Sequence, residues 1–241
     1  MLVEIGTTMK IEKIQHFKLK DIILISSLPD MGKVGGLVSG HFAKKLNVKL
    51  AAKLVLSDKP WVMQQGGLVN LPHDEYSIFV EEQKSVVIFT GDNQPQDGAS
   101  VFEMCKILLS AVREMGNIKL VISSGGYIPK QPGNGDRIFG VATNAKLLGE
   151  LRPLGVEILG PDINSITWFN GLVLGLAKEQ NLDGVGLFGE IADTETPQYR
   201  AAKNIVTTIG RIIKMEIDTK ELEGRVAPPS SELKKSSPGI G

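Results

Sequence analysis

Short apolar runs alternate with segments of helical periodicity along most of the chain. The apolar runs are rich in Val, Ile and Leu, and several are nearly continuous, which is typical of strands buried on both faces of a largely parallel sheet. We predict eight strands, at residues 22–26, 49–56, 76–80, 86–90, 119–123, 138–143, 156–159 and 185–189.

Four of the intervening segments place apolar residues on one helical face. In the first, Val34, Val38 and Phe42 recur at helical spacing. The second is expected to begin after the N-cap residue Asp97. The third contains "ITWFNGLVLGLA", which is apolar almost all round, so we expect it to be buried. The predicted helices cover residues 33–46, 99–115, 165–179 and 197–215.

This alternation predicts an α/β fold in which a mostly parallel sheet is flanked by helices. We expect one domain over residues 1–218, because no linker or internal repeat interrupts it. Residues 219–241 are rich in Pro, Ser, Gly and charge, and predict a flexible C-terminal tail. The sequence leaves open whether Met1 or Met9 is the native start.

Composition narrows the classes of partner. The chain has 27 basic and 27 acidic residues, so we expect neither nucleic acid nor a membrane surface as a partner recognised through bulk charge. Near neutrality also permits self-association. We find no apolar run of membrane-spanning length and no signal peptide, and the single Cys105 fits a reducing compartment, so we expect a cytoplasmic protein.

Glycine-rich and polar clusters follow several of the predicted strands. In an open parallel sheet the loops at the carboxyl ends of the strands converge on one rim, where ligands bind. Turn chemistry alone also favours Asp, Asn, Gly and Pro at such places, so a purely structural role stays open. The candidates for a ligand-binding rim are Asp30, Gly32, Lys33, Asp92, Gln94, Gly125, Gly126, Tyr127 and Glu190.

The stretch "SSLPDMGKVGG" resembles a phosphate-binding loop but lacks its spacing. Val34 follows Gly32-Lys33, where a Walker A loop needs Ser or Thr, and the glycines do not give G-x-G-x-x-G. A helix N-terminus beside Lys33 could still bind an anion. We predict no catalytic residue, no metal site and no cofactor, because the histidines lack ligand spacing and Cys105 falls on an apolar helical face.

A different kind of site is suggested by "DKPWVMQQGG". Trp61, Val62 and Met63 lie between predicted strands, in a long irregular stretch. Exposed, they would suit a protein interface. A buried tryptophan is the alternative.

Several segments taken in order resemble the proteasome assembly chaperone family, in the branch named after the second eukaryotic chaperone. They are "LPDMGKVGGLVSGHFAKKL", "FTGDNQP", "SSGGY", "VATN", "WFNGLVLGLAKEQNLDGVGLFGEI" and "TPQYRAAKNIVTTI". The resemblance implies a three-layer fold similar to the nucleoside phosphorylases. It also implies homo-oligomers or pairs with a paralogous chaperone chain, and binding to proteasome α-subunits.

The resemblance and the missing catalytic constellation together predict a non-enzymatic, oligomeric protein-binding scaffold. Some proteasome-binding relatives dock through a terminal hydrophobic-Tyr-any motif, whereas this sequence ends in "SSPGIG", so we expect binding through a folded surface or a partner chain. The alternative is a nucleotide- or nucleoside-binding protein or enzyme that uses the rim.

Overall fold

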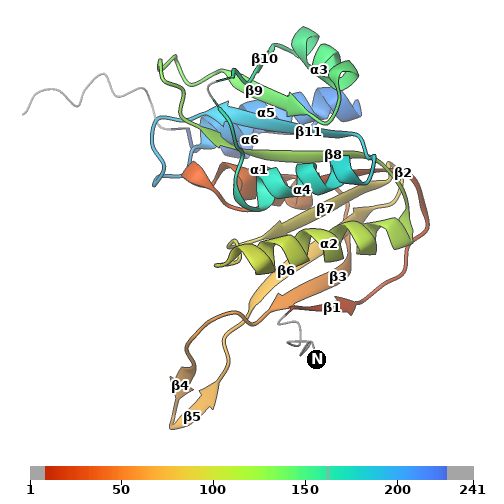
Figure 1. Ribbon diagram of the computed structural model, residues 1–241, viewed down its shortest axis with the longest axis vertical. Helices are drawn as coiled ribbons and strands as arrows, with labels where there is room; N and C mark the ends of the chain where they lie inside the picture. Colours follow the sequence, from red (N-terminus) through yellow and green to blue (C-terminus); the bar gives the residue numbers. More distant parts are fainter. Residues whose placement is uncertain (1–8, 162, 227–241) are drawn as a thin grey trace, which may run out of the picture.

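A nine-stranded sheet forms the centre of the computed structural model, which describes residues 9–161 and 163–226. The strand order is β1-β3-β6-β7-β2-β8-β11-β9-β10 (Figure 1). All eight predicted strands are confirmed, and β1 is an addition. The strands are β1 (Met9–Lys13), β2 (Leu19–Ser26), β3 (Lys49–Leu56), β6 (Asp74–Glu81), β7 (Val86–Gly91), β8 (Gly116–Tyr127), β9 (Ile138–Ala142), β10 (Val156–Ile158) and β11 (Gly184–Glu190).

The sheet is parallel at its centre and antiparallel towards one edge. The adjacent strands β7, β2, β8 and β11 all run in the same direction. The β1, β3, β6 and β7 pairings are antiparallel, as is that of β11 with β9. Four of the eight pairings in this sheet are parallel and four are antiparallel, so the sheet is mixed where we predicted a mostly parallel one. The strand β6 shows why, since its burial alternates and a short turn joins it to β7, as in an antiparallel hairpin.

Helices cover both faces of the sheet, which confirms the α/β class (Figure 1). α1 (Val34–Lys45) and α5 (Tyr199–Ile213) pack on one face, and α2 (Gly98–Met115) and α4 (Trp168–Glu179) on the other. Each face has its own apolar core. On the α2 and α4 side the rings of Tyr76, Phe89 and Phe169 follow one another, with centroids 5.9 and 5.2 Å apart.

The helix starts show where local sequence signals succeeded. Asp97 caps α2 as predicted, because its Oδ1 accepts a hydrogen bond from the Ser100 backbone N–H at 2.9 Å. The expectation that the third helix is buried holds for one face only. In α4 Trp168, Gly175, Lys178 and Glu179 are exposed, since this helix forms an outer layer.

The domain continues beyond the predicted start of the tail. A short helix, α6 (Lys220–Glu223), buries Leu222 in the core on the α1 and α5 side. Ion pairs join this segment to both helices, namely Lys44–Glu221, Lys45–Asp218 and Lys203–Glu223. The predicted boundary at residue 219 is therefore too early, because one buried leucine and three lysines hold the segment down. Residues 227–241 lie outside the described residues.

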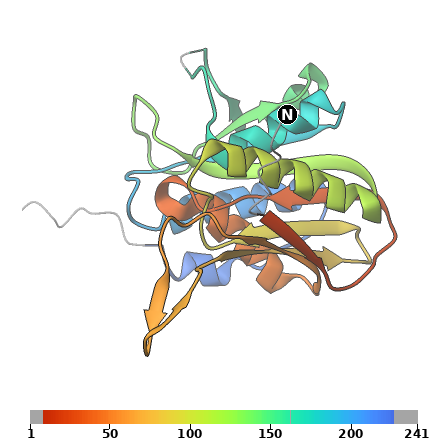
Figure 2. The same cartoon turned by 60° about the horizontal axis from the view of Figure 1, so that its bottom comes forward.

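The hydrophobic pattern of the sequence did not predict several short elements. α3 (Ala145–Leu151) is capped by Asn144, and the single turns η1 (Met31–Lys33) and η2 (Arg152–Leu154) lie beside longer helices. The strands β4 (Met63–Gln65) and β5 (Leu68–Asn70) pair with each other in a sheet of their own. They project from the body between β3 and β6, in both Figure 1 and Figure 2. We call residues 60–72 the arm.

Candidate functional site at the carboxyl edge of the sheet

The predicted rim residues come together at one edge of the sheet. Since β7, β2, β8 and β11 are neighbours that run in the same direction, the loops after them open on the same side. This carboxyl edge is on the left in Figure 1, where the arm also leaves the body. The geometry of each loop shows what its polar groups do.

Asp30 joins three elements at this edge. Its Oδ1 accepts a hydrogen bond from the Gly35 N–H at 2.9 Å, and its Oδ2 accepts one from the Gly126 N–H at 2.7 Å. The carboxylate thus connects the end of β2 with the first turn of α1 and the end of β8. Burial raises the pKa of Asp30 to about 7, against the opposing effect of these backbone donors.

The glycines of β8 make room for that carboxylate. A Cβ atom on Gly125 would lie 2.3 Å from Asp30 Oδ2, so a side chain there would displace the acid. On Gly126 a Cβ would lie 2.4 Å from the carbonyl oxygen of Met31. "SSGGY" therefore reflects the close approach of the β2–α1 loop to the end of β8.

Gly32 connects neighbouring loops through its backbone. Its N–H donates to the Thr194 carbonyl at 2.8 Å, and its own carbonyl accepts from the Gln198 N–H at 2.9 Å. Its φ of +63° lies in the left-handed region, where glycine is favoured. Lys33, which follows, is exposed.

Gln94 makes two bonds that fix the β7–α2 loop. Its Nε2 donates to the Pro29 carbonyl at 2.8 Å, and its Oε1 accepts from the Phe169 N–H at 3.0 Å. The side chain therefore positions the first turn of α4 against the β2–α1 loop. Asp92, on the same loop, is exposed to solvent.

Glu190, at the end of β11, holds the β8–β9 loop. Arg137 Nε donates to Glu190 Oε2 at 3.0 Å, and the Gly133 N–H donates to Oε1. The Arg137 guanidinium lowers the pKa of this buried carboxyl. The half-buried ring of Tyr127 packs edge-on against Phe139, with the centroids 4.8 Å apart.

Below the rim lies a polar cluster whose central residue the sequence analysis missed. Asn170 Oδ1 accepts from the Leu28 N–H at 2.9 Å, while its Nδ2 donates to the Leu28 carbonyl at 2.9 Å. Ser27 and Ser124 join their hydroxyls at 2.8 Å nearby. The signal was present, because a lone Asn in an otherwise apolar helix needs a buried partner.

These contacts give Asp30, Gln94 and Glu190 a role in joining loops, and leave Lys33 and Asp92 as the exposed charged candidates. Within the described ranges, no group of three or more His, Cys, Asp or Glu side chains could hold a metal ion.

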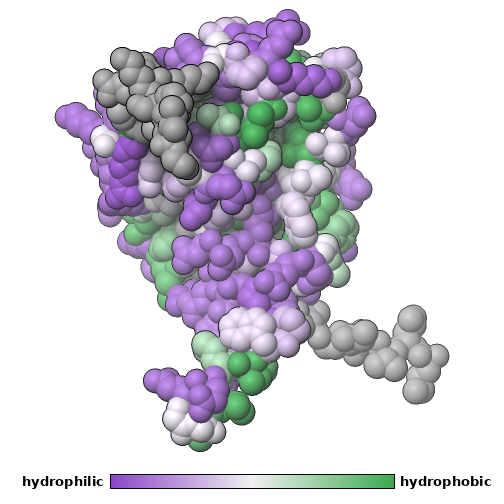
Figure 3. All heavy atoms as spheres, turned by 90° about the vertical axis from the view of Figure 1, so that its left-hand side faces the viewer, coloured by the Kyte–Doolittle hydropathy of each residue, from purple (hydrophilic) through white to green (hydrophobic). Residues whose placement is uncertain are grey.

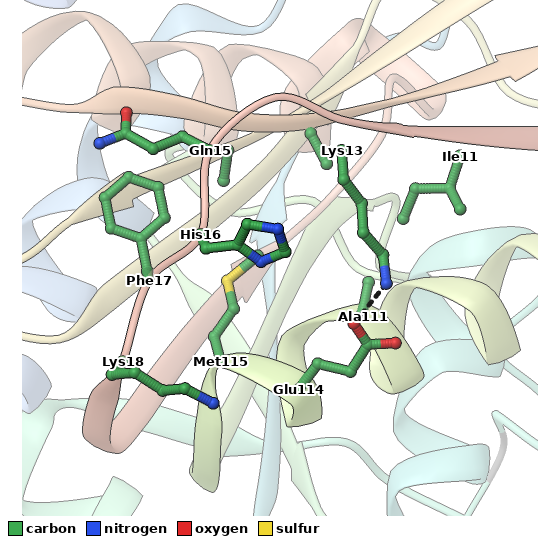
Figure 4. Close-up of a pocket in the computed structure, with 11 residues that line it drawn as sticks. Ile11, Lys13, Gln15, His16, Phe17, Lys18, Ala111, Glu114 and Met115 are labelled. Atoms are coloured by element: carbon green, nitrogen blue, oxygen red, sulfur yellow. Dashed lines mark hydrogen bonds and ion pairs between the residues drawn. The ribbon is translucent and has the colours of Figure 1, made fainter.

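A cavity of about 310 Å³ lies away from this edge. It is formed where β1, the β1–β2 loop, the start of β3 and the end of α2 meet, which is the opposite end of the sheet. In Figure 4, Lys13 and Glu114 point toward each other across its wall, and the His16 ring lies beside Met115. Of its two lysines, Lys13 is thus already paired with an acid.

The interface candidates lie on the arm. Trp61, Val62 and Met63 are between 47% and 53% exposed, so the alternative of a buried tryptophan does not hold. Leu68, Val69 and Leu71 across the hairpin are between 66% and 73% exposed. Figure 3 shows apolar surface on this projection, with hydrophilic residues beside it.

Comparison with known proteins places the chain in a family. The sequence model of the PAC2 family matches residues 24–235, most of the chain. The chain belongs to the PAC2 family. This agrees with the family that the ordered motifs of the sequence resemble.

Two solved structures of archaeal proteins are similar to the structure of this PAC2 chain. PbaB of Pyrococcus furiosus, an archaeal proteasome activator, is 26% identical, with a TM-score of 0.77 over 91% of this chain and 95% of PbaB. PbaA of the same organism, an archaeal homolog of proteasome-assembly chaperone, is 22% identical, with a TM-score of 0.73 over 89% and 86%. An uncharacterized protein of Methanocaldococcus jannaschii is 24% identical over 90% of this chain and 83% of its own length.

Over the residues that the structure describes, no helix is both long enough and apolar enough to cross a membrane.

Proposed function

We propose that this chain is a proteasome-assembly-chaperone-like protein that acts as an oligomeric scaffold and binds proteasome α-subunits. The observation that carries the proposal is the PAC2 match over residues 24–235. The likeness to PbaB, a proteasome activator, supports it at 26% identity across nearly the full length of both chains.

The carboxyl edge supports a binding role rather than a chemical one. The polar side chains that could act on a small molecule, Asp30, Gln94 and Glu190, are bonded to backbone groups or to Arg137. The same edge carries the exposed apolar arm, and exposed apolar patches of this kind mark surfaces that meet other proteins.

Capture from native extract tests the proposal. The tagged full-length chain is expected to enrich proteasome α-subunits or their assembly precursors over a tagged control protein of similar size and charge. A paralogous PAC2 chain in the same eluate would fit a hetero-oligomeric scaffold. An eluate without α-subunits or precursors would remove the support for a proteasome role.

A thermal-shift panel separates this proposal from the nucleotide-binding alternative. A ligand that binds only the folded state raises the melting temperature. We expect no shift with nucleoside, nucleotide or inorganic phosphate at millimolar concentration. A clear shift with one of them would favour a ligand site at the rim.

A further inference from the structure

Exposed apolar side chains gather on one edge of the molecule. Of the large hydrophobic residues that are exposed in the described chain, all but Ile14 lie on segments that leave from or arrive at the carboxyl edge. The arm contributes Trp61, Val62, Met63, Leu68, Val69 and Leu71, and loops and helix starts elsewhere along this edge contribute Met31, Phe102, Ile128 and Trp168.

The arm is unusual in having no charge. Residues 60–72, "PWVMQQGGLVNLP", contain no Asp, Glu, Lys or Arg, although 22% of the whole chain is charged. Register and side-chain alternation show that each face of the hairpin carries apolar side chains beside uncharged amides. Gln65 pairs with Leu68 and Gln64 with Val69, so Met63 and Leu68 point to one face and Val69 to the other.

The backbone of the arm is also incompletely paired. Among the described residues β4 and β5 pair only with each other, so the outer edge of each strand keeps free N–H and C=O groups. An isolated two-stranded hairpin is marginally stable in water. A strand of another chain that pairs at an outer edge would satisfy the free groups of that edge.

The base of the arm is held firmly. Lys59 Nζ lies 2.7 Å from Asp74 Oδ2 and 3.3 Å from Asp58 Oδ1, and none of these three side chains is more than 14% exposed. Asn93 and the Gln96 N–H, from the β7–α2 loop, bond to the same two carboxylates. The arm therefore leaves the body in a fixed direction, which reduces the entropy lost when it docks.

We infer that the arm is a self-association surface, and that it is covered by the arm of a second copy of this chain. In a two-fold contact the same residues face each other, so a charged arm would bring like charges together. An arm without charges avoids this, and the zero formal net charge of the chain lets two copies approach. A foreign partner would impose no such requirement.

The exposed area is of the right size for such a contact. Six side chains that expose roughly half or more of their surface offer on the order of 100 Å² each, or ~600 Å² per copy, against the ~800 Å² that each partner buries in a standard interface. The inference rests on the proposed oligomeric scaffold and names its surface.

The test measures the mass of the purified full chain in solution, without proteasome subunits, so it can fail independently of the proposed function. We expect the wild type to be oligomeric at ~10 μM and Leu68→Asp/Val69→Asp to dissociate at least ~100-fold more readily, with an unchanged circular dichroism spectrum. Ile14→Asp is the matched control, because Ile14 is exposed on the opposite edge, and it should behave as the wild type.

A cysteine variant supplies a second measurement that does not weaken the arm. Leu71→Cys should form a disulfide-linked dimer under mild oxidation, whereas Ile14→Cys should not. Burial raises the pKa of the native Cys105 thiol to about 12, so it does not compete. A monomeric wild type, or an Asp variant that stays oligomeric, would overturn the inference. Loss of α-subunit binding with an intact oligomer would do so too, because it would assign the arm to a foreign partner.

Discussion

Gly35 provides a strict test of how closely α1 approaches the sheet. In Gly35→Ala the new Cβ would lie 2.3 Å from the Leu28 carbonyl oxygen and 2.8 Å from both the Ser124 oxygen and Asn170 Nδ2. Two of these atoms belong to backbone, which cannot rotate away. The first turn of α1 must therefore move by about 1 Å before the contacts become ordinary.

That movement would strain the bonds that hold the turn. The Asp30 bond to the Gly35 N–H and the Ser39 bond to the Ser27 carbonyl both span the gap that has to widen. Overpacking costs about 1–3 kcal/mol and each weakened hydrogen bond about 1 kcal/mol. Alanine returns at most about 1 kcal/mol through its helix propensity. We expect a net loss of about 2–4 kcal/mol in the free energy of unfolding.

Gly40 is the matched control on the same helix. A Cβ there meets no atom within 4 Å, so Gly40→Ala should stabilise the protein by about 0.5–1 kcal/mol. Urea unfolding of the two variants and the wild type, followed by circular dichroism at one protein concentration, gives the comparison. If Gly35→Ala matched Gly40→Ala within about 0.5 kcal/mol, the close approach that we describe would be wrong.

Two further predictions concern buried charges. Folding raises the pKa of Asp30 from 3.8 to about 7. Between about pH 4 and pH 7 the folded protein therefore holds a proton on Asp30 that the unfolded chain has lost. The free energy of unfolding should fall as the pH rises through this range. In the wild type the free energy of unfolding, measured by urea, should fall with pH across this range by up to about 1.4 kcal/mol per pH unit. Asp30→Asn should lack this fall, and a variant with the same pH dependence as the wild type would contradict the assignment to Asp30. Lys59→Met leaves Asp58 and Asp74 without their cation and should cost about 3 kcal/mol, with faster hydrogen exchange in the arm. Lys49→Met, which breaks the exposed pair with Glu82, should change stability by less than about 1 kcal/mol, and equal losses would refute the special role of Lys59.

The strands of the main sheet were predictable because buried strands have nearly continuous apolar sequences. β2 and β7 pair in parallel at the centre of the sheet, and most of their Val, Ile and Leu side chains are buried there. The cap at Asp97 was predictable for a similar reason, since its hydrogen bond is local. Apolar runs and local hydrogen bonds can be recognised in the sequence without knowledge of the tertiary fold.

Features that depend on distant partners were not predictable in this way. In the sequence Leu222 lies in a polar segment, and only the folded structure shows that it is buried in the core on the α1 and α5 side. The partner of Asn170 is Leu28, which is 142 positions away in the sequence. The rim residues could be grouped from topology, but whether Asp30 faces a ligand or the Gly126 N–H depends on atomic geometry.

The arm falls between these two cases. Its apolar residues were visible in the sequence, and Trp61, Val62 and Met63 were interpreted as an interface. The hairpin itself was missed because its strands have only three residues each, although the Gly66–Gly67 turn between them is the local signal of a two-residue hairpin.

We propose that this PAC2 chain binds proteasome α-subunits, and purified components can test that binding. Purified full-length protein titrated with purified α-subunits of its own organism, and followed by analytical ultracentrifugation, tests it most directly, with purified β-subunits as the control. The account predicts a complex with α-subunits at micromolar concentrations and none with β-subunits. An intact PAC2 oligomer that sediments apart from α-subunits at ~50 μM of each, a concentration at which even a weak specific complex would form, would contradict the account.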